Sequence, residues 1–406
     1  MRILFLSRWY PFPPHNGSKI RIYNLLRVLS EEHEVDLIAL ADPTERVGGR
    51  ADRLDDICRS VRVIPRPVYQ PTSGKALAAL LSSRPRYLVD TYSQAFTDTL
   101  HSSLASRSYD LIVGSQFSMM PYAWEARDWP VLLEELELGL FRDAACVPIS
   151  GLGSLRTRLT WAKMSRYLRT TLPTFSACTV ASSTERQHVL DLMPDYRSVH
   201  LIPNCIDVDD YAGVYESRES NALVFSGALT YDANYHGMAW FLDHVYPAIQ
   251  AQHPSARLRI TGSVDGVDLS SLRLAPGCEL TGHVADIRTL IARSTVSVVP
   301  LLTGGGTRLK ILESMALGTP VVATTKGAEG LDATPGEHLL VADTPSEFAS
   351  YVATLLGSPG LRQQLAERGR AFVRSHFDWK VVGPKFLNAV EHAAHGRSVL
   401  ASGSLA

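Results

Sequence analysis

Short runs of apolar, often β-branched residues recur along the chain, separated by longer segments whose apolar positions follow a helical period. Such runs are typical of parallel strands that helices bury on both faces. Seven runs lie in the first half, at 3–6, 35–40, 61–64, 111–113, 131–133, 178–181 and 199–202, and five in the second, at 222–225, 258–261, 296–301, 320–323 and 338–341. The pattern predicts two doubly wound α/β sheets, one after the other.

A polar segment separates the two groups of runs. Residues 204–221 show neither a strand period nor a helix period, so we expect the interdomain linker there. The expected parts of the chain are a first domain at 1–205, a second at 206–376, helices at 345–356, 361–376 and 377–395, and a flexible tail at 396–406. Open α/β sheets bind ligands beyond the carboxyl ends of their strands. We therefore expect the chemistry in a crevice between the domains.

Composition and charge exclude several classes of protein. The 406 residues carry 40 Lys and Arg against 41 Asp and Glu, which leaves no general attraction for nucleic acids. No run of 18 apolar residues occurs and the first apolar run stops at Ser7, so the sequence predicts neither a membrane span nor a signal peptide. The five cysteines form no CxxC pair, which favours a reducing compartment. A cytoplasmic protein is expected.

The segment 298–323 is the most informative part of the sequence. It is expected to form a strand, a glycine loop at Gly304, Gly305 and Gly306, a helix, and a second strand. The expected features of the helix are a cap at Thr307, an apolar face of Leu309, Leu312 and Ala316, and a left-handed end at Gly318. Three glycines before a helix let the backbone approach a ligand and direct free N–H groups toward it, which suits an anion.

Two cations stand where the helix dipole favours acids. Arg308 and Lys310 lie in the first turn, and no acidic residue occurs among the first five positions from Thr307. A bound phosphate or diphosphate would supply the missing negative charge, with Arg308 as a bidentate donor and Lys310 as a point charge. The alternative is two solvated side chains, with Lys310 paired to Glu313. Glu313 fits either an acceptor of ribose hydroxyls or a plain surface acid.

This stretch resembles the nucleotide-sugar signature of the retaining group 1 glycosyltransferases with the GT-B fold, in the subgroup whose loop reads GxGTRLKxLE. Further segments resemble the family in the same order along the chain: the first strand and the loop at Gly17, the turn at 203–207, the opening of the second domain at 225–234, the loops at 282–284 and 327–331, and the helix start at 377–379. The resemblance implies two Rossmann-like α/β domains that face each other across a cleft, with the helix 377–395 packing back on the first.

The resemblance also implies roles for individual residues. The residues implied in donor binding are Gly17, Asn234, Gly282, His283, Val284, Gly304, Gly305, Gly306, Thr307 and Glu313. Arg308 and Lys310 would act on the leaving diphosphate, and Gln116 and Glu135 are candidates on the acceptor side. In the family the sugar comes from a nucleotide-diphosphate sugar and the leaving phosphate takes the acceptor proton, so neither a protein base nor a metal or other cofactor is expected.

The sequence departs from the family pattern at several of these positions. Gly305 occupies the place of the first of two glutamates, Cys205 replaces a glycine, and Gln116 stands for the usual histidine. Ala228 and Asn234 occupy the places of a basic pair that commonly grips the diphosphate. In this chain Arg308 and Lys310 would take over that duty.

Three interpretations therefore stand. The first is a retaining glycosyltransferase that moves a sugar from a UDP- or GDP-sugar to a glycan or lipid-linked acceptor in surface polysaccharide biosynthesis. The second is a catalytically silent relative that binds nucleotide-sugar or glycan as an assembly protein, because Gly305 and Gln116 depart from the pattern. The third is an epimerase of free nucleotide-sugars, which needs cleft carboxylates and histidines that the sequence does not identify.

A basic segment suggests a further partner. Residues 155–169 carry five Lys or Arg residues and no acids, interleaved with apolar positions. A basic amphipathic helix can lie on anionic lipid, which would suit a lipid-linked acceptor. The alternative is a solvated helix whose apolar side packs inward. Peripheral contact with the inner face of the membrane is therefore a hypothesis.

Overall fold

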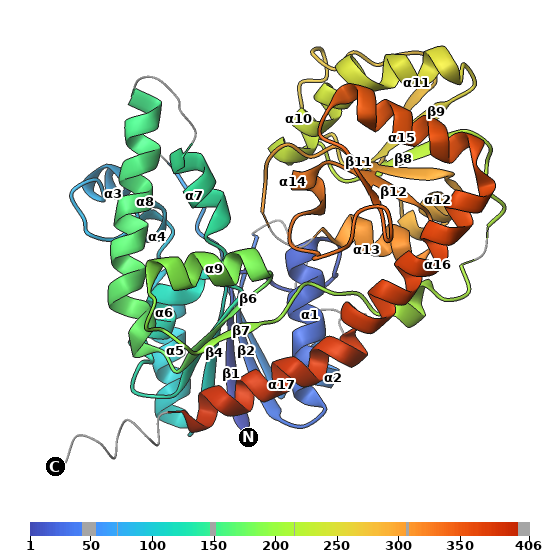
Figure 1. The fold of residues 1–406 in the computed structure, drawn as a ribbon. Helices are drawn as coiled ribbons and strands as arrows, with labels where there is room; N and C mark the ends of the chain where they lie inside the picture. Colours follow the sequence, from blue (N-terminus) through green and yellow to red (C-terminus); the bar gives the residue numbers. More distant parts are fainter. Residues whose placement is uncertain (43–53, 71, 147–151, 215, 306–307, 397–406) are drawn as a thin grey trace. The chain divides into compact units, whose positions relative to one another are not determined.

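The computed structural model describes residues 1–42, 54–70, 72–146, 152–214, 216–305 and 308–396. The chain divides into two compact units (Figure 1): unit 1 comprises residues 1–203 and 383–406, and unit 2 comprises residues 204–382. Each unit contains one parallel sheet with helices on both faces, so the predicted fold class of two Rossmann-like α/β domains is confirmed.

Unit 1 is built on a seven-stranded parallel sheet of order β3-β2-β1-β4-β5-β6-β7. Its strands are β1 (Arg2–Ser7), β2 (Glu34–Ala41), β3 (Ser60–Pro65), β4 (Leu111–Ser115), β5 (Val131–Glu134), β6 (Ala177–Val180) and β7 (Val199–Leu201). From β1 the chain adds β2 and β3 on one side and then β4 on the other. The strand order therefore switches between β1 and β4, and the carboxyl ends of these two strands border the natural ligand crevice of the sheet.

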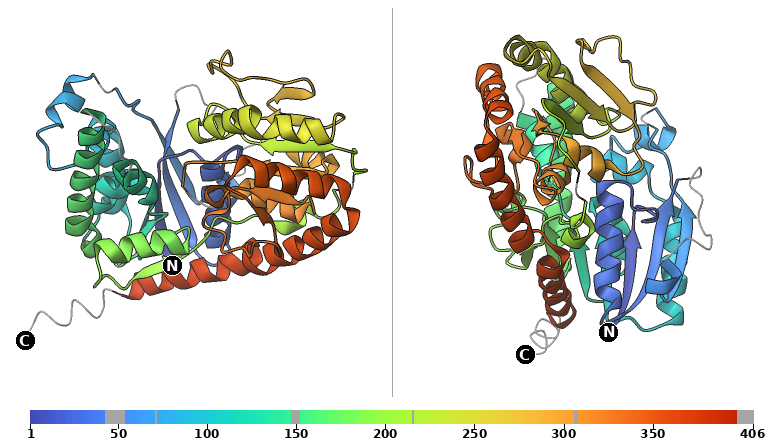
Figure 2. Two further views of the ribbon diagram at one scale, coloured as in Figure 1. Left: turned by 45° about the horizontal axis from the view of Figure 1, so that its top comes forward. Right: turned by 90° about the vertical axis from the view of Figure 1, so that its right-hand side faces the viewer.

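Helices cover both faces of this sheet because alternate strand residues are buried on opposite sides. The helical segments of unit 1 are α1 (Gly17–Ser30), α2 (Leu54–Ile57), α3 (Gly74–Ala78), α4 (Arg86–Asp90), α5 (Gln94–Ser106), η1 (Phe117–Met119), α6 (Met120–Glu125), α7 (Gly139–Cys146), α8 (Leu152–Thr171), η2 (Leu172–Thr174) and α9 (Ser183–Leu192). Leu4 and Leu6 belong to the core cluster that α5, α6 and α8 complete. Helix α1 packs beside β2 (Figure 2).

Unit 2 is built on a six-stranded parallel sheet of order β10-β9-β8-β11-β12-β13. Its strands are β8 (Ala222–Ser226), β9 (Arg257–Thr261), β10 (Cys278–Gly282), β11 (Val296–Val299), β12 (Val321–Ala323) and β13 (Leu340–Val341). The strand order switches between β8 and β11. Strand β10 was not predicted, because this edge strand is only partly buried and its sequence, Cys-Glu-Leu-Thr-Gly, lacks the continuous apolar run of a buried strand.

The helical segments of unit 2 are η3 (Val208–Tyr211), α10 (Asp232–Trp240), the π-helical turn η4 (Phe241–Val245), α11 (Tyr246–Gln252), α12 (Ile287–Arg293), α13 (Leu309–Ala316), α14 (Thr325–Ala328), α15 (Pro345–Gly357) and α16 (Pro359–His376). Helix α17 (Trp379–His395) begins in unit 2 and continues in unit 1. The segment 204–221 was predicted to be irregular, but it contains η3. None of the helices that the structure describes combines the length and the apolar character needed to cross a bilayer.

Helix α13 differs in detail from its prediction. It starts at Leu309 with Arg308 in the N-cap position, and the expected cap, Thr307, lies outside the described residues, as does Gly306. The predicted apolar face of Leu309, Leu312 and Ala316 is wrong in part, since the buried apolar residues are Ile311, Leu312 and Met315. The left-handed end at Gly318 is confirmed, with φ of 73°.

Candidate functional site

Glycines follow the carboxyl ends of β8 and β11 in unit 2, where the lack of a Cβ lets neighbouring side chains come close to the backbone. Gly227 follows β8, and a Cβ placed there would stand 2.7 Å from Lys310 Nζ and 2.8 Å from Asn234 Nδ2. Gly304 follows β11 with φ of 98°, a conformation that favours glycine. Glycine at these two positions leaves the space between the strand ends to polar side chains.

The ammonium group of Lys310 occupies part of this space. Its Nζ donates to Asn234 Oδ1 at 2.8 Å and lies 4.4 Å from the centre of the Phe225 ring. Asn234 in turn donates from Nδ2 to the carbonyl of Ala228 at 2.8 Å. Lys310 therefore reaches from α13 to the loop after β8, where the resemblance places the missing basic pair. The alternative pairing with Glu313 is not what the structure shows.

Burial changes the acid–base behaviour of this amine. Desolvation, reinforced by the nearby Arg308 guanidinium and opposed by Glu313, lowers the pKa of Lys310 to about 7. A buried cation whose partners are a neutral amide oxygen and a ring face is stabilised further by an anionic ligand. This is the electrostatic property that an anion site requires.

Arg308 has a different place. Its side chain is buried, and Nη1 donates to the carbonyl of Gly305 at 2.5 Å while Nη2 donates to the carbonyl of Gly304 at 2.7 Å. Nη2 also donates to the carbonyl of Lys326 at 3.3 Å. The guanidinium thus holds the described part of the glycine loop against the segment that follows β12. The two cations that the sequence analysis treated as a pair have distinct contacts.

Glu313 lies one turn beyond Lys310 on α13. Its Oε1 accepts a hydrogen bond of 3.0 Å from the hydroxyl of Tyr211, a residue of η3 that the sequence analysis did not single out. Burial raises the pKa of Glu313, and the Tyr211 hydroxyl and the Lys310 ammonium oppose that rise. A tyrosine in a polar linker gives no sequence signal of such a contact, because only the fold brings η3 to α13.

Three of the residues predicted to bind the donor, Gly282, His283 and Val284, stand at the end of β10. Gly282 has φ of 67°, and its carbonyl accepts from the Gly262 N–H at 2.9 Å. His283 is exposed and Val284 is half-buried. Within the described chain, no hydrogen bond connects these residues to Lys310 or Glu313.

The crevice of unit 1, between β1 and β4, is bordered by the predicted Gly17. This glycine is the first residue of α1 and is exposed, and Asn16 caps the helix by accepting from the Lys19 N–H at 3.0 Å. The end of α1 that carries the free N–H groups therefore stands at the switch point of this sheet.

Gln116 and Glu135 meet at the same edge. Gln116 Nε2 donates to Glu135 Oε2 at 2.9 Å and to Ser18 Oγ at 3.1 Å, while its Oε1 accepts from the indole nitrogen of Trp9 at 3.2 Å. Burial is the main cause that raises the pKa of Glu135 to about 7, and the Arg21 charge opposes it. The two acceptor-side candidates thus form one polar network with residues from the ends of β1, β4 and β5.

The backbone at both residues is strained. Gln116 has φ of 70° and ψ of 160°, and Glu135 has φ of 54°. The conformation of Gln116 is one that residues other than glycine rarely adopt, and such strain gathers at functional sites. No sequence pattern signals it, because glutamine has no special preference for positive φ.

This strain predicts an inverted order of stability for two matched variants. Glycine normally costs about 0.5–1 kcal/mol relative to alanine. At position 116 both substitutions remove the same amide, but only glycine relieves the backbone, so Gln116→Gly should be more stable to urea than Gln116→Ala by about 1–2 kcal/mol. Equal or reversed urea midpoints would show that the positive φ carries no strain.

Glu134 lies beside this network but has a structural role. Its Oε1 accepts from Arg21 Nε at 2.6 Å and its Oε2 from Ser115 Oγ at 2.8 Å, and neither charged side chain is more than 1% exposed. Arg21 also donates to the carbonyl of Ile202 at 3.0 Å. Of the two adjacent glutamates, only Glu135 therefore belongs to the candidate site.

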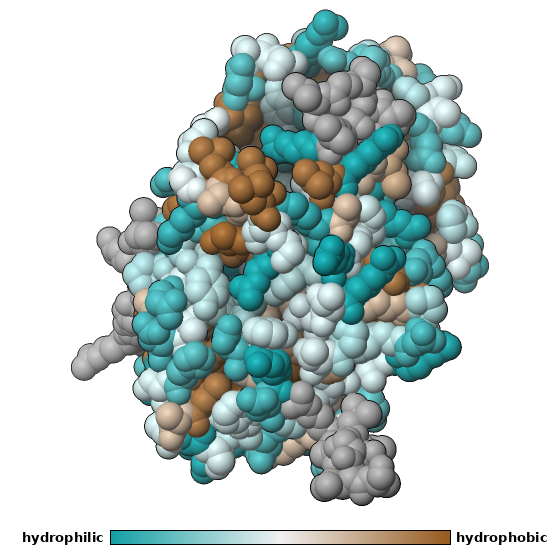
Figure 3. All heavy atoms as spheres, turned by 90° about the vertical axis from the view of Figure 1, so that its left-hand side faces the viewer, coloured by the Kyte–Doolittle hydropathy of each residue, from teal (hydrophilic) through white to brown (hydrophobic). Residues whose placement is uncertain are grey.

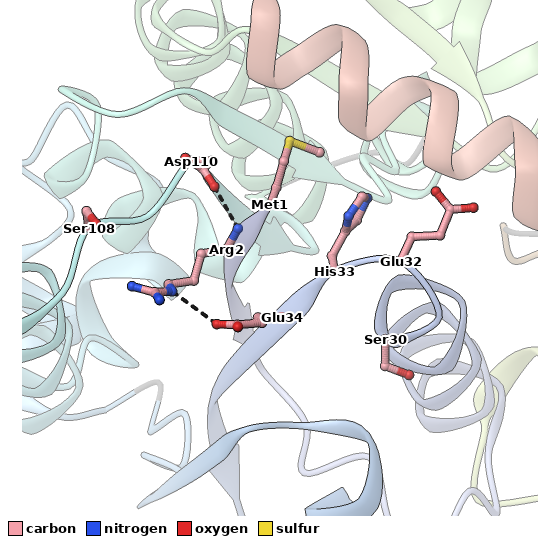
Figure 4. A pocket seen from close by; sticks show the side chains of 8 residues that line it. All are labelled: Met1, Arg2, Ser30, Glu32, His33, Glu34, Ser108 and Asp110. Carbon is pink, nitrogen blue, oxygen red and sulfur yellow. Dashed lines mark hydrogen bonds and ion pairs between the residues drawn. The ribbon is translucent and has the colours of Figure 1, made fainter.

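A separate cavity of about 640 Å³ lies at the opposite edge of the unit 1 sheet, near the amino ends of β1 and β2 (Figure 4). Its walls include Arg2, His33, Glu34 and Asp110. The Arg2 backbone N–H donates to Asp110 at 2.7 Å and its side chain pairs with Glu34 at 3.1 Å. The cavity shares no residue with the predicted site. The described residues hold no cluster of three or more His, Cys, Asp or Glu side chains suited to a metal ion.

Two family models match separate parts of the chain. The glycosyl transferase 4-like domain matches residues 16–205, and the group 1 glycosyl transferases match residues 220–358. Among curated relatives, a phosphatidyl-myo-inositol mannosyltransferase of Mycobacterium leprae is 29% identical over 203 residues, which cover 48% of this chain and 53% of the relative. An uncharacterized 44.6 kDa protein in the cps region of Klebsiella pneumoniae is 25% identical over 168 residues, covering 39% and 43%. The chain thus spans about half the length of these relatives.

Solved structures match almost the whole chain. Sucrose-phosphate synthase from Thermosynechococcus elongatus superposes with a TM-score of 0.71 at 17% identity, covering 99% of this chain and 100% of that one. HepE of Anabaena, in complex with UDP and glucose, superposes with a TM-score of 0.65 at 16% identity, covering 96% and 99%. At this identity the likeness shows the fold. The family rests on the two models: each half of the chain matches a glycosyltransferase domain, so the chain belongs to the glycosyltransferases, and its fold is GT-B.

Proposed function

We propose that this protein is a retaining hexosyltransferase that moves a sugar from a UDP- or GDP-sugar to a glycan or glycolipid acceptor in surface polysaccharide biosynthesis. The observation that carries the proposal is the position of Lys310. Its ammonium lies at the switch point of unit 2, next to Asn234 and the loop after β8. A nucleoside diphosphate at that point would place its negative charge on this cation.

In the proposed sugar transfer, each group around Lys310 has a specific role. The bond between the sugar C1 and the diphosphate oxygen breaks, the acceptor hydroxyl oxygen bonds to C1 on the same face, and its proton passes to the leaving diphosphate. Lys310 stabilises the charge that develops on the diphosphate, without solvent reorganisation. Arg308 fixes the conformation of the glycine loop by donating hydrogen bonds to the carbonyls of Gly304 and Gly305. Glu313 accepts from the ribose hydroxyls, with Tyr211 orienting its carboxylate.

The proposal needs neither a metal nor a protein base, because the leaving group accepts the proton and Lys310 supplies the charge. The site named for the acceptor is the network of Gln116 and Glu135. The protein in the cps region of Klebsiella pneumoniae supports a role in surface polysaccharide, and the mannosyltransferase of Mycobacterium leprae supports a lipid-linked acceptor.

Binding of a nucleoside diphosphate tests the proposal directly. Thermal-shift measurements with UDP, GDP, ADP and dTDP should give a large stabilisation with one base, about 2.7 kcal/mol at one hundred times Kd. Absence of a shift with all four would overturn the proposal. The second candidate function is that of a catalytically silent relative, because Gly305 and Gln116 depart from the family pattern. Hydrolysis of the matching nucleotide-sugar in the absence of an acceptor distinguishes the enzyme from such a relative. The silent relative predicts binding with no hydrolysis.

The affinity for the diphosphate should depend on pH in a defined direction. Because the pKa of Lys310 is about 7, the free protein loses this charge as the pH rises from 7 to 8.5. We expect the Kd of the nucleoside diphosphate to rise by about tenfold over that range, since only the ammonium form attracts the anion. Calorimetric titration at each pH checks this. Lys310→Arg, which stays charged, should show little change, and a parallel rise in both proteins would assign the effect to the ligand.

Peripheral membrane contact belongs to the same proposal. Helix α8 buries Met164 and Leu168, as the inward-packing alternative predicted, but Leu159 points outward with Arg156 and Arg158. Lys163 Nζ donates to the carbonyl of Leu80 at 2.6 Å, which joins α8 to the segment after α3. Leu77 of α3 and the following Leu80 and Leu81 are exposed, Leu81 at 95%. Hydrophobic groups gather on this face of the molecule (Figure 3).

The charge of this face selects its partner. Neither α8 nor the segment 74–86 contains an acidic residue, while both carry Lys and Arg. Exposed leucines on segments that carry basic and no acidic residues suit an anionic lipid surface. Co-sedimentation with phosphatidylglycerol vesicles should therefore exceed that with phosphatidylcholine vesicles, and Leu81→Glu should abolish the difference. Leu274→Glu, a matched change at an exposed leucine of unit 2, should leave it intact. Equal sedimentation of both lipids would remove membrane contact from the proposal.

A further inference from the structure

A second pair of cations lies in unit 1, around Trp9. Arg8 follows β1, and its guanidinium carbon lies 5.3 Å from the centre of the Trp9 ring and 5.2 Å from that of the Tyr87 ring. Arg66 follows β3, and its guanidinium carbon lies 4.7 Å from the Trp9 ring. Two guanidinium groups from the ends of different strands therefore share one indole.

The charges of this cluster do not balance. Arg66 pairs with Asp42 at 2.7 Å. Arg8, by contrast, makes ring contacts but no hydrogen bond or ion pair with any residue in the described ranges. Burial and the like charge of Arg66 lower the pKa of Arg8, while Tyr87 opposes this. Removing a guanidinium from water without an anionic partner costs free energy, and such a cost is common where a ligand supplies the missing charge.

A cavity opens between these side chains. It is lined on its polar side by Arg8, Arg66, Tyr87, Thr91 and Ser118, and its volume of about 20 Å³ accommodates a single oxygen-sized group. Arg66 Nε and Ser118 Oγ are buried there, and the described residues offer neither atom a hydrogen-bond partner. A buried donor without a partner costs about 1–3 kcal/mol. The cavity therefore presents N–H and O–H donors and a net positive charge to whatever enters it.

The cluster adjoins the acceptor-side network. The indole nitrogen of Trp9 donates to Gln116 at 3.2 Å, and Gln116 donates to Glu135. The same tryptophan therefore contacts the two guanidinium groups and the residue at the end of β4. The substituents of a sugar bound at Gln116 would therefore reach the cavity at Arg8.

We propose that Arg8, Arg66 and Ser118 bind an oxyanion, a phosphate or a carboxylate, that is carried by the acceptor. The acceptor is accordingly a sugar phosphate or an acidic glycan rather than a neutral one. This inference rests on the proposed function, because it assigns the acceptor of that reaction. A single anionic oxygen enters the cavity, and the rest of the phosphate or carboxylate and the sugar ring stay outside it near Gln116.

Binding of simple sugars to the full chain tests the inference. Calorimetric titration or ligand-observed NMR would compare glucose 6-phosphate and glucuronate with neutral glucose. The phosphate or the carboxylate sugar should bind at least tenfold more tightly than glucose, and which of the two binds identifies the source of the oxyanion. Arg8→Gln should remove that preference, and Ser118→Ala should weaken it severalfold. Arg27→Gln, which removes an equal charge from the exposed side of α1, should leave it unchanged.

The outcomes separate this inference from the proposed function. No preference for either anionic sugar, or an unchanged preference in folded Arg8→Gln, would overturn the inference. Should Arg8→Gln fail to fold, Arg8→Lys and Ser118→Ala carry the same test, because each keeps the bulk of the side chain and changes its donors. The thermal shift with the nucleoside diphosphate should be the same in all these variants, since it reports on unit 2. Loss of that shift in the wild-type chain would instead overturn the proposed function.

Discussion

Replacing Lys310 by glutamine should lower kcat/KM for sugar transfer by about 10²–10³, the usual cost of removing one preorganised donor from a developing anion. Glutamine is one atom shorter than lysine and uncharged, so it removes the charge that would face the leaving diphosphate and lengthens the contact with Asn234. The loss should appear mainly in kcat, because the charge on the leaving group grows in the transition state. Steady-state kinetics with the matching nucleotide-sugar measures it.

Stability separates this effect from a folding defect. Desolvation disfavours the charged form of Lys310 in the folded protein, so the neutral amide should leave the free energy of unfolding unchanged or raise it. Lys380→Gln is the matched control, because it removes the same charge from an exposed pair with Asp209. Its activity should equal that of the wild type. An active, stable Lys310→Gln protein would remove this lysine from the transfer step.

Replacing Arg21 by methionine should destabilise the protein by about 3–5 kcal/mol, since it leaves the carboxylate of Glu134 buried without its counter-charge. Both side chains are buried, and the 2.6 Å contact is their shortest. The carbonyl of Ile202 also loses a donor, and the more distant Glu135 loses a compensating charge at 3.6 Å. Urea unfolding measures the change through the midpoint and slope.

A double variant isolates the cause of that loss. Arg21→Met combined with Glu134→Gln removes both charges and should recover a substantial part of the lost free energy, because no unpaired carboxylate remains. Arg2→Met removes one of the two arginines that pair with the exposed Glu34 and should cost less than about 1 kcal/mol. Additive losses in the double variant would show that the two charges do not interact.

The hydrophobic pattern predicts most of the fold because parallel strands buried on both faces need continuous apolar runs. The runs at 3–6 and 35–40 correspond to β1 and β2, and the glycine loop with its helix corresponds to the segment before and through α13. Strand β10 was not predicted because it lies at an edge and keeps a glutamate and a threonine within five residues. Edge strands lose the apolar signal on which the prediction depends.

The candidate site was predictable only in part. The sequence singled out Lys310 and Asn234 separately, but only the fold brings the amine of α13 to the amide of α10. The contact of Tyr211 with Glu313 joins residues 102 positions apart, and no local pattern encodes such a separation. The backbone of Gln116 and the cations around Trp9 were missed for the same reason, because strain and charge imbalance arise from tertiary packing.

The glycines at the strand ends of unit 2 set limits on how this sequence can diversify. A Cβ at Gly262 would stand 2.5 Å from the backbone nitrogen of Ala228, and one at Gly327 would collide with the carbonyl oxygen of Val299. Neither obstacle is a flexible side chain, so a saturation library should recover glycine almost alone at both positions. His283 is exposed and follows Gly282, whose carbonyl accepts from the Gly262 N–H, so the same library should recover many residue types at position 283. New ligand preferences in this scaffold can therefore evolve through the loop after β10 while its strand ends stay fixed.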